Sequence, residues 1–306
     1  MAPKIHPIDW FMLSGLVFAW GSSFAMIKIA VGHFDAVWVM ALRLAIAALV
    51  LAPYALLKGH GLAAAPAVWG KFTWLAFTGN VLPFFLITWG TGFVSSGVSG
   101  LLMGAVPLYL LVLAHFALAD ERLTLPKAAG FVMGFAGIVI LIGPGTLLDF
   151  TTSGKALWGE LSILAGGLCY AVHAVSAKRL GFDHPIKQSA CVCLAAAIIG
   201  LSAAMLMSPH GLAGKPPAAF WAIIGLGLLP TALATLLMYR LMERIGPAFV
   251  AYSNYLVPVY AVLLGAAVLG ESLSWNVLAA LILILLGIAV SRWNFSLSRH
   301  LGDHAA

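Results

Sequence analysis

A few polar and aromatic side chains stand inside otherwise apolar segments of the sequence, where they could bind a small molecule. Trp20 and Ser23 share one face of the first apolar segment, residues 8–31, at helical spacing. Tyr170 and His173 share the corresponding face of the sixth apolar segment, residues 156–179. Aromatic rings supply apolar walls, and a hydroxyl or an imidazole supplies hydrogen bonds. We interpret these side chains as the lining of a binding cavity; the alternative is close packing between helices.

Two asparagines extend this set because each is followed by a proline. Asn80 precedes Pro83 in the third segment, and Asn254 precedes Pro258 in the ninth. Proline removes a backbone donor and frees a carbonyl oxygen, which suits a helix that lines a cavity. Neutral donors and acceptors among aromatic rings suit a small polar or zwitterionic molecule with an apolar part. The alternative is ordinary hydrogen bonding between helices.

Ionisable side chains inside the apolar segments are further candidates, because a charge in lipid is costly. His173 could respond to protons near neutral pH, or serve as a structural hydrogen bonder. Arg43, Lys28 and Lys178 have stems long enough to reach an interface by snorkelling. Glu160 is the only carboxylate that we expect to face the cavity. An ion-driven pump built on a midplane carboxylate is therefore disfavoured, which leaves exchange or facilitated export.

The composition explains why such side chains stand out. Hydrophobic residues make up 62% of the chain, charged residues 8%, and the mean hydropathy is +1.04. Soluble proteins are about 25% charged, so this is an integral membrane protein with the lipid bilayer as its solvent. Its basic residues are scattered singly, which argues against a nucleic-acid partner. Cys191 and Cys193 point to different helix faces, so we expect no metal site, and we expect no cofactor.

The apolar runs are continuous rather than alternating, which predicts helices and not the strands of a barrel. Each run is close to the ~20 residues that cross about 30 Å of hydrocarbon. We therefore expect an all-α membrane protein with ten transmembrane helices. The predicted spans are residues 8–31, 35–57, 71–90, 95–118, 125–143, 156–179, 185–207, 218–240, 248–269 and 274–291.

The distribution of lysine and arginine predicts the orientation of these spans in the membrane. If the N-terminus is cytoplasmic, only Lys28, Lys155 and Lys215 fall on the outer side, and Arg43 lies within a span. All other basic residues then face the cytoplasm: Lys4, Lys58, Lys71, Arg122, Lys127, Lys178, Arg179, Lys187, Arg240, Arg244, Arg292 and Arg299. We therefore expect both termini in the cytoplasm and a place in the cell (inner) membrane.

The second half of the chain repeats landmarks of the first half. Lys178 follows Tyr170 as Lys28 follows Trp20, at the same offset along the sequence. The pattern also predicts two repeats of five helices, residues 1–143 and residues 144–306, the latter including a short cytoplasmic tail. An odd number of helices in each repeat inserts the second repeat upside down relative to the first, which is typical of transporters with a midplane binding site.

Several motifs, taken in order, carry a resemblance to a known family. They are Trp20-Gly21-Ser22-Ser23-Phe24, Pro107, Glu121-Arg122-Leu123-Thr124, Pro258 and Gly270-Glu271-Ser272-Leu273-Ser274. In order and duplication they resemble the EamA family of the drug/metabolite transporter superfamily. The resemblance implies a cavity lined mainly by the first, third and fourth helices of each half. It also implies export of small metabolites such as amino acids, without naming the substrate.

Two further motifs have structural interpretations. Thr124 and Ser274 are expected to cap the fifth and tenth helices, with Glu121 and Glu271 favouring the positive helix ends. In the fifth helix, the small residues Gly130, Gly134 and Gly137 are expected to form a face for close packing, within the fold or in a possible homodimer.

The function that we expect is export of small metabolites by alternating access, most simply amino acids or related amphiphilic compounds, and not enzymatic catalysis. Two alternatives remain at this point. Ser99, in a Gly-Val-Ser-Gly stretch, together with His173 superficially resembles the catalytic pair of rhomboid intramembrane proteases. A membrane receptor or scaffold without transport would bind a ligand and show no saturable flux.

Overall fold

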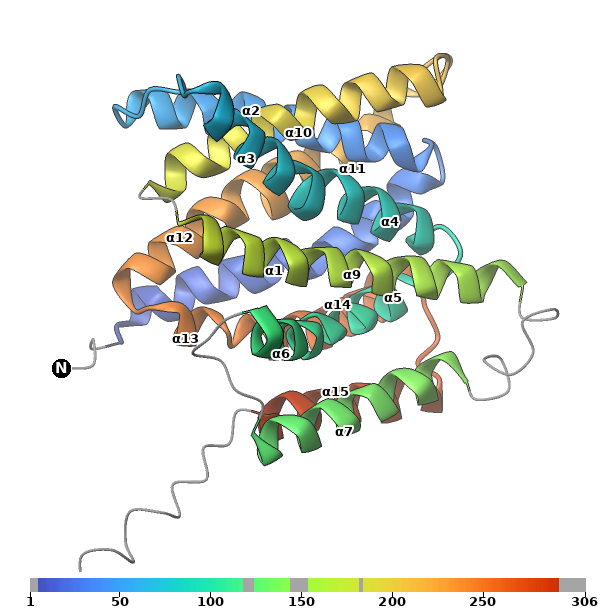
Figure 1. Ribbon diagram of the computed structural model, residues 1–306. Helices are drawn as coiled ribbons and strands as arrows, with labels where there is room; N and C mark the ends of the chain where they lie inside the picture. Colours follow the sequence, from blue (N-terminus) through green and yellow to red (C-terminus); the bar gives the residue numbers. More distant parts are fainter. Residues whose placement is uncertain (1–4, 118–123, 144–153, 182–183, 292–306) are drawn as a thin grey trace, which may run out of the picture.

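The computed structural model describes residues 5–117, 124–143, 154–181 and 184–291, and every regular element in these ranges is a helix. The long helices run roughly side by side (Figure 1). Within the described ranges, eight helical runs have the length and hydropathy of membrane spans, and two shorter apolar helices complete the set. The fold is therefore all-α, and its ten helical runs agree with the predicted number.

Most of the runs are single α-helices. They are α1 (Pro7–Val31), α2 (Ala36–Leu57), α7 (Leu125–Ile142), α9 (Gly154–Leu180), α10 (Pro185–Met207) and α15 (Trp275–Ser291). The bounds agree with the predicted spans to within a few residues, because hydropathy locates the apolar run and the flanking prolines and glycines end it.

The other runs change helix type along their length. A π-helical segment, Phe77–Val81, joins α3 (Pro66–Ala76) to α4 (Leu82–Thr91), and a 3₁₀ turn, Met103–Ala105, joins α5 (Ser96–Leu102) to α6 (Val106–Ala117). A second π-helical segment, Leu228–Leu233, joins α11 (Phe220–Gly227) to α12 (Ala234–Arg244), and a 3₁₀ turn, Pro217–Ala219, precedes α11. The short helix α13 (Pro247–Val250) leads into α14 (Ser253–Leu269).

Prolines account for the π-helical segments. Pro83 has no N–H to donate to the carbonyl of Gly79, four residues earlier, and Pro230 has none for Leu226. The hydroxyl of Thr231 donates to the Leu226 carbonyl instead, at 2.8 Å. By contrast, α14 continues through Pro258 without a change of helix type. Of the two prolines that the sequence singled out, Pro83 thus lies beside a change of helix type and Pro258 does not, while Pro230 lies within a π-helical segment.

Glycines let α7 pack against α15 at backbone distance, and the two helices lie together at the bottom of Figure 1. A Cβ on Gly130 would overlap the Gly287 carbonyl, and one on Gly137 would lie 3.0 Å from the Ile284 side chain. A Cβ on Gly134 would overlap the Leu108 side chain of α6. The glycine face of the fifth span is therefore used for packing within the fold.

The helix ends form two opposite ends of the molecule, which we name after one residue each. The Arg244 end, at the left in Figure 1, holds the N-terminus of α1 and the C-terminus of α12. There Arg244 donates from Nε to the carboxylate of the fully buried Asp9, at 2.8 Å. The Glu271 end holds the C-terminus of α1 and the connection between α14 and α15.

The structure corrects the expected role of Glu271. Its carboxylate does not serve the start of α15 but accepts hydrogen bonds at the start of α5, from the backbone N–H of Ser96 at 2.6 Å and of Gly97 at 2.9 Å. Thr124 does precede α7 as predicted, yet its side chain makes no capping hydrogen bond. Glu121 lies outside the described residues.

Candidate functional site

A cavity of about 390 Å³ lies between the helices of the two halves. All six side chains that the sequence suggested as a binding site line it: Trp20, Ser23, Asn80, Tyr170, His173 and Asn254. They come from α1, the π-helical segment after α3, α9 and α14. The structure therefore brings together residues from opposite halves of the chain around one space, and substrate binding there stays a prediction.

The α1 side of the cavity is held close to α14 by a glycine. A Cβ on Gly21 would overlap the ring of Tyr260, so only glycine permits this approach. Two residues along α1, the Ser23 hydroxyl donates to the Trp20 carbonyl at 2.6 Å. Because its hydrogen is already used, Ser23 can offer a ligand only the acceptor side of its oxygen.

His173 has a fixed place on the α9 side. Its Nδ1 lies 3.1 Å from the carbonyl oxygen of Leu75. A carbonyl can only accept, so Nδ1 carries the hydrogen and Nε2 is the free position of the neutral ring. The ring fills the space that a Cβ on Gly79 would occupy, in the π-helical segment that Pro83 induces. The same histidine is thus a structural hydrogen bonder and a lining residue.

The sequence left two places open for the Arg43 side chain, the interior of the protein or an interface reached by snorkelling, and in the structure it faces the interior. Its side chain is only 6% exposed and lines the cavity. Nε donates to the Thr231 hydroxyl at 2.8 Å, and the guanidinium carbon lies 3.8 Å from the centre of the Phe84 ring. The sequence signal was present, since an arginine in mid-span is costly unless it faces the interior.

Lys28 also has protein partners. Its ammonium donates to the carbonyl of Thr91, the last residue of α4, at 3.1 Å and to that of Val94, just beyond the helix, at 2.7 Å. A cation at a helix C-terminus stabilises the unpaired carbonyls there. Lys28 therefore ties α1 to the connection between α4 and α5, rather than reaching out to lipid headgroups.

Glu160 is not a cavity residue, contrary to expectation. It lies on α9 but is absent from the cavity lining, and no Asp or Glu among the described residues lines this space. The cavity also receives side chains that the sequence did not single out, chiefly from α10 and α12. They are Gln188, Ser189, Val192, Cys193, Thr235, Met238 and Tyr239. The first, third and fourth helices of each half thus share the lining with α2 and α10.

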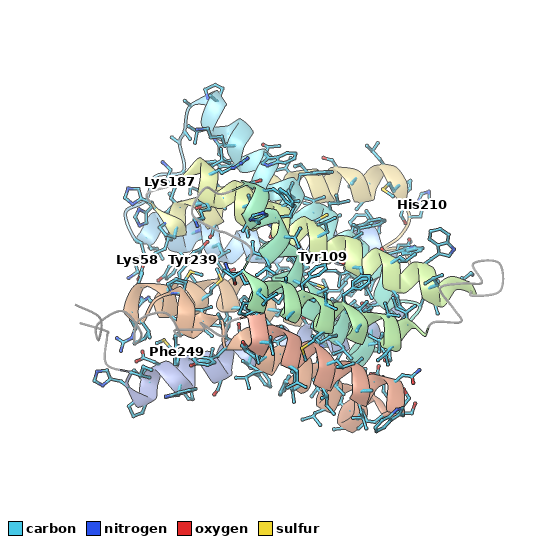
Figure 2. The ribbon with its side chains drawn as sticks, turned by 60° about the horizontal axis from the view of Figure 1, so that its bottom comes forward. Lys58, Tyr109, Lys187, His210, Tyr239 and Phe249 are labelled. Atoms are coloured by element: carbon cyan, nitrogen blue, oxygen red, sulfur yellow. The ribbon has the colours of Figure 1, made fainter. Side chains whose placement is uncertain are left out.

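These additional residues extend the cavity toward the Arg244 end. Gln188 and Ser189 stand in the first two turns of α10, and Tyr239 stands in the last two turns of α12. Ser189 donates to the Tyr239 hydroxyl at 2.8 Å. In Figure 2, Tyr239 lies on the same side of the molecule as Lys58, Lys187 and Phe249, whereas His210 lies at the opposite end.

At the Glu271 end the helices close over the cavity. A Cβ on Gly100 of α5 would overlap Ala261 of α14, and one on Gly97 would lie 3.3 Å from the Val262 backbone. At the same end, Glu271 binds the start of α5, and Lys28 binds the end of α4. Helix packing and polar contacts therefore seal this end, while the cavity extends toward the other.

The two asparagines and Ser99 differ in what they offer a ligand. In the described part of the chain, no hydrogen bond uses the side-chain amide of Asn80 or Asn254, so both amides face the cavity with their donors and acceptors open. Ser99 is fully buried and donates to the Ser95 carbonyl at 3.0 Å. Its hydroxyl hydrogen is thus used at the start of α5, and among the described residues no hydrogen bond joins Ser99 to His173, as the pair of a serine protease would require.

Comparison with known proteins identifies the family. A model of the EamA-like transporter family matches the chain twice, at residues 9–143 and 157–293. The Escherichia coli K12 protein named "Uncharacterized inner membrane transporter YedA" is 26% identical over 295 residues, covering 92% of this chain and 91% of that protein. The Bacillus subtilis "Uncharacterized transporter YoaV" is 28% identical over 69% of this chain and 71% of that protein.

Two further similarities are to a solved structure and to a protein that is named as an exporter. A crystal structure superposes with a TM-score of 0.66 at 22% identity, covering 93% of this chain and 97% of that one, which shows a shared fold. A Streptantibioticus cattleyicolor protein named "Probable terminal-alkyne amino-acid exporter" is 28% identical over 186 residues, covering 61% of this chain and 60% of that protein. The family match spans most of the sequence, and the chain belongs to the EamA-like transporter family of multi-pass membrane proteins.

Proposed function

We propose that this protein exports small amphiphilic metabolites, amino acids or related compounds, across the inner membrane by alternating access. The observation that carries the proposal is a central cavity sealed at the Glu271 end and extended toward the Arg244 end. By the positive-inside rule the Arg244 end is cytoplasmic, and so are both termini. The structure would then be an inward-facing state, able to load a substrate from the cytoplasm.

An inverted repeat gives this cavity a way to reverse its access. The family model matches two stretches of similar length, and each contains five helical runs. The two π-helical segments, 77–81 and 228–233, stand at corresponding places in the two stretches. We therefore divide the chain into repeats 1–143 and 144–306, the second entering the membrane upside down. Rocking one repeat against the other would exchange the sealed and the open end.

The contacts at the Glu271 end are the ones that outward opening must break. Lys28 and Glu271 both bind the backbone around the α4–α5 connection. These polar contacts cross between elements rather than lie within one helix, so they can be released without unfolding a helix. By sequence position, Lys178 in the second half corresponds to Lys28, and Glu121 in the first half corresponds to Glu271. We expect the contacts of Lys178 and Glu121 to seal the cytoplasmic end in the outward-facing state.

The lining supports an amphiphilic cargo. Trp20 and Tyr170 supply aromatic surface, while Ser23, Asn80, His173 and Asn254 supply neutral hydrogen-bonding groups. Such a mixture fits a small molecule with one polar head and an apolar body. The name of the Streptantibioticus cattleyicolor relative, an amino-acid exporter, agrees with this choice of cargo.

Counterflow in proteoliposomes tests the proposal. Vesicles loaded with an unlabelled amino acid should accumulate the labelled compound from outside, faster than protein-free vesicles, for at least one member of an amino-acid panel. A receptor or scaffold would bind a panel member without counterflow. A serine protease would be labelled at Ser99 by a fluorophosphonate. Absence of counterflow across a panel of amino acids, nucleosides, sugars and polyamines would reject the transport proposal.

A further inference from the structure

Arg43 carries a buried charge that the described residues do not neutralise. The ionisable groups that interact with it electrostatically are Tyr170 and Cys193, and neither is a carboxylate. The cavity that Arg43 lines contains no Asp or Glu from the described ranges. A buried guanidinium without an anionic partner is costly, so something other than these side chains is expected to complete its environment.

The guanidinium is held in one orientation. Its Nε donates a hydrogen bond to the Thr231 hydroxyl at 2.8 Å. That hydroxyl in turn donates to the Leu226 carbonyl, so the threonine oxygen is fixed as an acceptor toward Arg43. Phe84 lies against the guanidinium at 3.8 Å, a stacking that arginine favours. The side chain therefore has little freedom to turn away from the cavity.

The two terminal nitrogens of Arg43 are available for a ligand. No hydrogen bond between described residues uses them, and neither is among the described side-chain atoms that are buried without a partner. A planar pair of N–H groups matches the two oxygens of a carboxylate, with two parallel hydrogen bonds. The arrangement of a fixed guanidinium with a free edge is that of a carboxylate clamp.

We propose that Arg43 anchors the carboxylate of the transported molecule, whose apolar body lies against the aromatic lining. This inference rests on the proposed function and narrows the substrate class to monocarboxylates, amino acids among them. Arg43 is the only lysine or arginine of the described chain in the cavity lining, so one negative charge satisfies the site. Because no described carboxylate lines the cavity, a substrate ammonium group is not required, and amines without an acidic group are disfavoured.

Three probes of similar shape test the inference: 3-phenylpropanoate, which has only a carboxylate, phenylalanine, which is a zwitterion, and phenylalaninamide, which has only an ammonium group. Binding to the purified full-length protein is measured by thermal stabilisation, and counterflow is measured in parallel. We expect 3-phenylpropanoate and phenylalanine to bind and phenylalaninamide to bind at least about tenfold more weakly, because charge-assisted hydrogen bonds to the guanidinium are lost.

Variants of the clamp separate its charge from its orientation. Arg43→Gln should weaken 3-phenylpropanoate binding about tenfold or more, and Arg43→Lys should weaken it less, because it keeps the charge and loses the planar fork. Thr231→Val keeps Arg43 and removes its orienting hydrogen bond, so it tests the clamp even if Arg43→Gln does not fold as judged by gel filtration. Arg240→Gln, at an exposed arginine, is the matched control and should bind like the wild type.

The outcomes for the two proposals differ. The carboxylate inference would be overturned if phenylalaninamide and 3-phenylpropanoate bound equally well. It would also be overturned if a folded Arg43→Gln or Thr231→Val protein bound 3-phenylpropanoate with wild-type affinity. In either case, counterflow of other compounds would still support the transport function. Arg43-dependent binding of 3-phenylpropanoate without counterflow of any compound would reject transport and keep the carboxylate site. Failure of both carboxylate probes to bind the wild type would overturn the inference, whatever the transport result.

Discussion

Glu271 accepts the backbone N–H of Ser96 at 2.6 Å, although the two residues belong to different halves of the chain. The Ser96 hydroxyl donates to the second oxygen of the same carboxylate at 3.0 Å, and the N–H of Gly97 joins it. A carboxylate at a helix N-terminus satisfies unpaired N–H groups and favours the positive end of the helix dipole. One side chain thus fastens the start of α5 to the α14–α15 connection at the sealed end.

We expect Glu271→Gln to lower the free energy of unfolding by about 1.5–3 kcal/mol, because the charge-assisted hydrogen bonds weaken. The measurement is thermal unfolding of the purified protein in detergent, without substrate. Glu243→Gln removes a carboxylate from an exposed position of α12 and serves as the control, with an expected change within about 0.5 kcal/mol. Equal stability of the two variants would mean that the carboxylate does not fasten this end.

We expect Lys28→Met to act in the same direction, since three carbonyls at the C-terminus of α4 and just beyond it lose their donor. The loss is about 1–3 kcal/mol, which corresponds to leaving partly buried acceptors unsatisfied. Lys155→Met, at an exposed lysine of the same end, is the control and should unfold at the wild-type temperature. Wild-type stability of Lys28→Met would show that water replaces the lysine at no cost.

Gly79→Ala is expected to disturb the cavity from within, because the new Cβ would overlap the His173 ring. Moving that ring breaks its hydrogen bond to Leu75, and overpacking of this kind costs about 1–3 kcal/mol. Gly70→Ala is a matched control in α3, where a Cβ would meet nothing within 4 Å. Stability and counterflow are measured for both. Wild-type behaviour of Gly79→Ala would argue against a tight His173 site.

Trp20→Ala, Tyr170→Ala and Asn254→Ala are expected to reduce counterflow of a transported substrate at least about tenfold each, if these side chains contact the substrate. A matched control is Trp221→Ala, at an aromatic residue that is 72% exposed and outside the cavity. Circular dichroism and gel filtration confirm folding before flux is compared. Unchanged flux in all three cavity variants would reject the site assignment.

The helices of this fold could be predicted from the sequence, and their mutual contacts could not. Hydropathy located the spans because lipid demands long apolar runs. The aromatic face around Trp20 was visible as helical spacing, and the structure places it at the cavity. By contrast, Glu271 and its partner Ser96 are distant in sequence, so no local pattern indicates which helix start the carboxylate serves.

Arg43 shows a second limit of prediction from the sequence. Its position in mid-span was evident, but the direction of its side chain depends on Phe84 of α4 and Thr231 of the other half. A long, flexible side chain can reach an interface or a cavity from the same backbone position. Gln188 and Tyr239 were missed for a similar reason, since they stand near helix ends, where polar residues are commonplace.

Side-specific labelling of one cavity residue tests whether the cavity opens to the two faces of the membrane in turn. Asn254→Cys is made in a protein whose native Cys169, Cys191 and Cys193 are replaced by serine, and a membrane-impermeant thiol reagent is added to either face of oriented vesicles. We predict modification from the cytoplasmic face at rest, and from the outer face only during substrate exchange or when Glu271→Gln opens the sealed end. Leu49→Cys is the control, at a position in α2 that is 75% exposed on the surface expected to face lipid. A reagent that cannot enter the membrane should not modify this position from either face. Equal modification of Asn254→Cys from both faces at rest, or from neither face under any condition, would contradict alternating access.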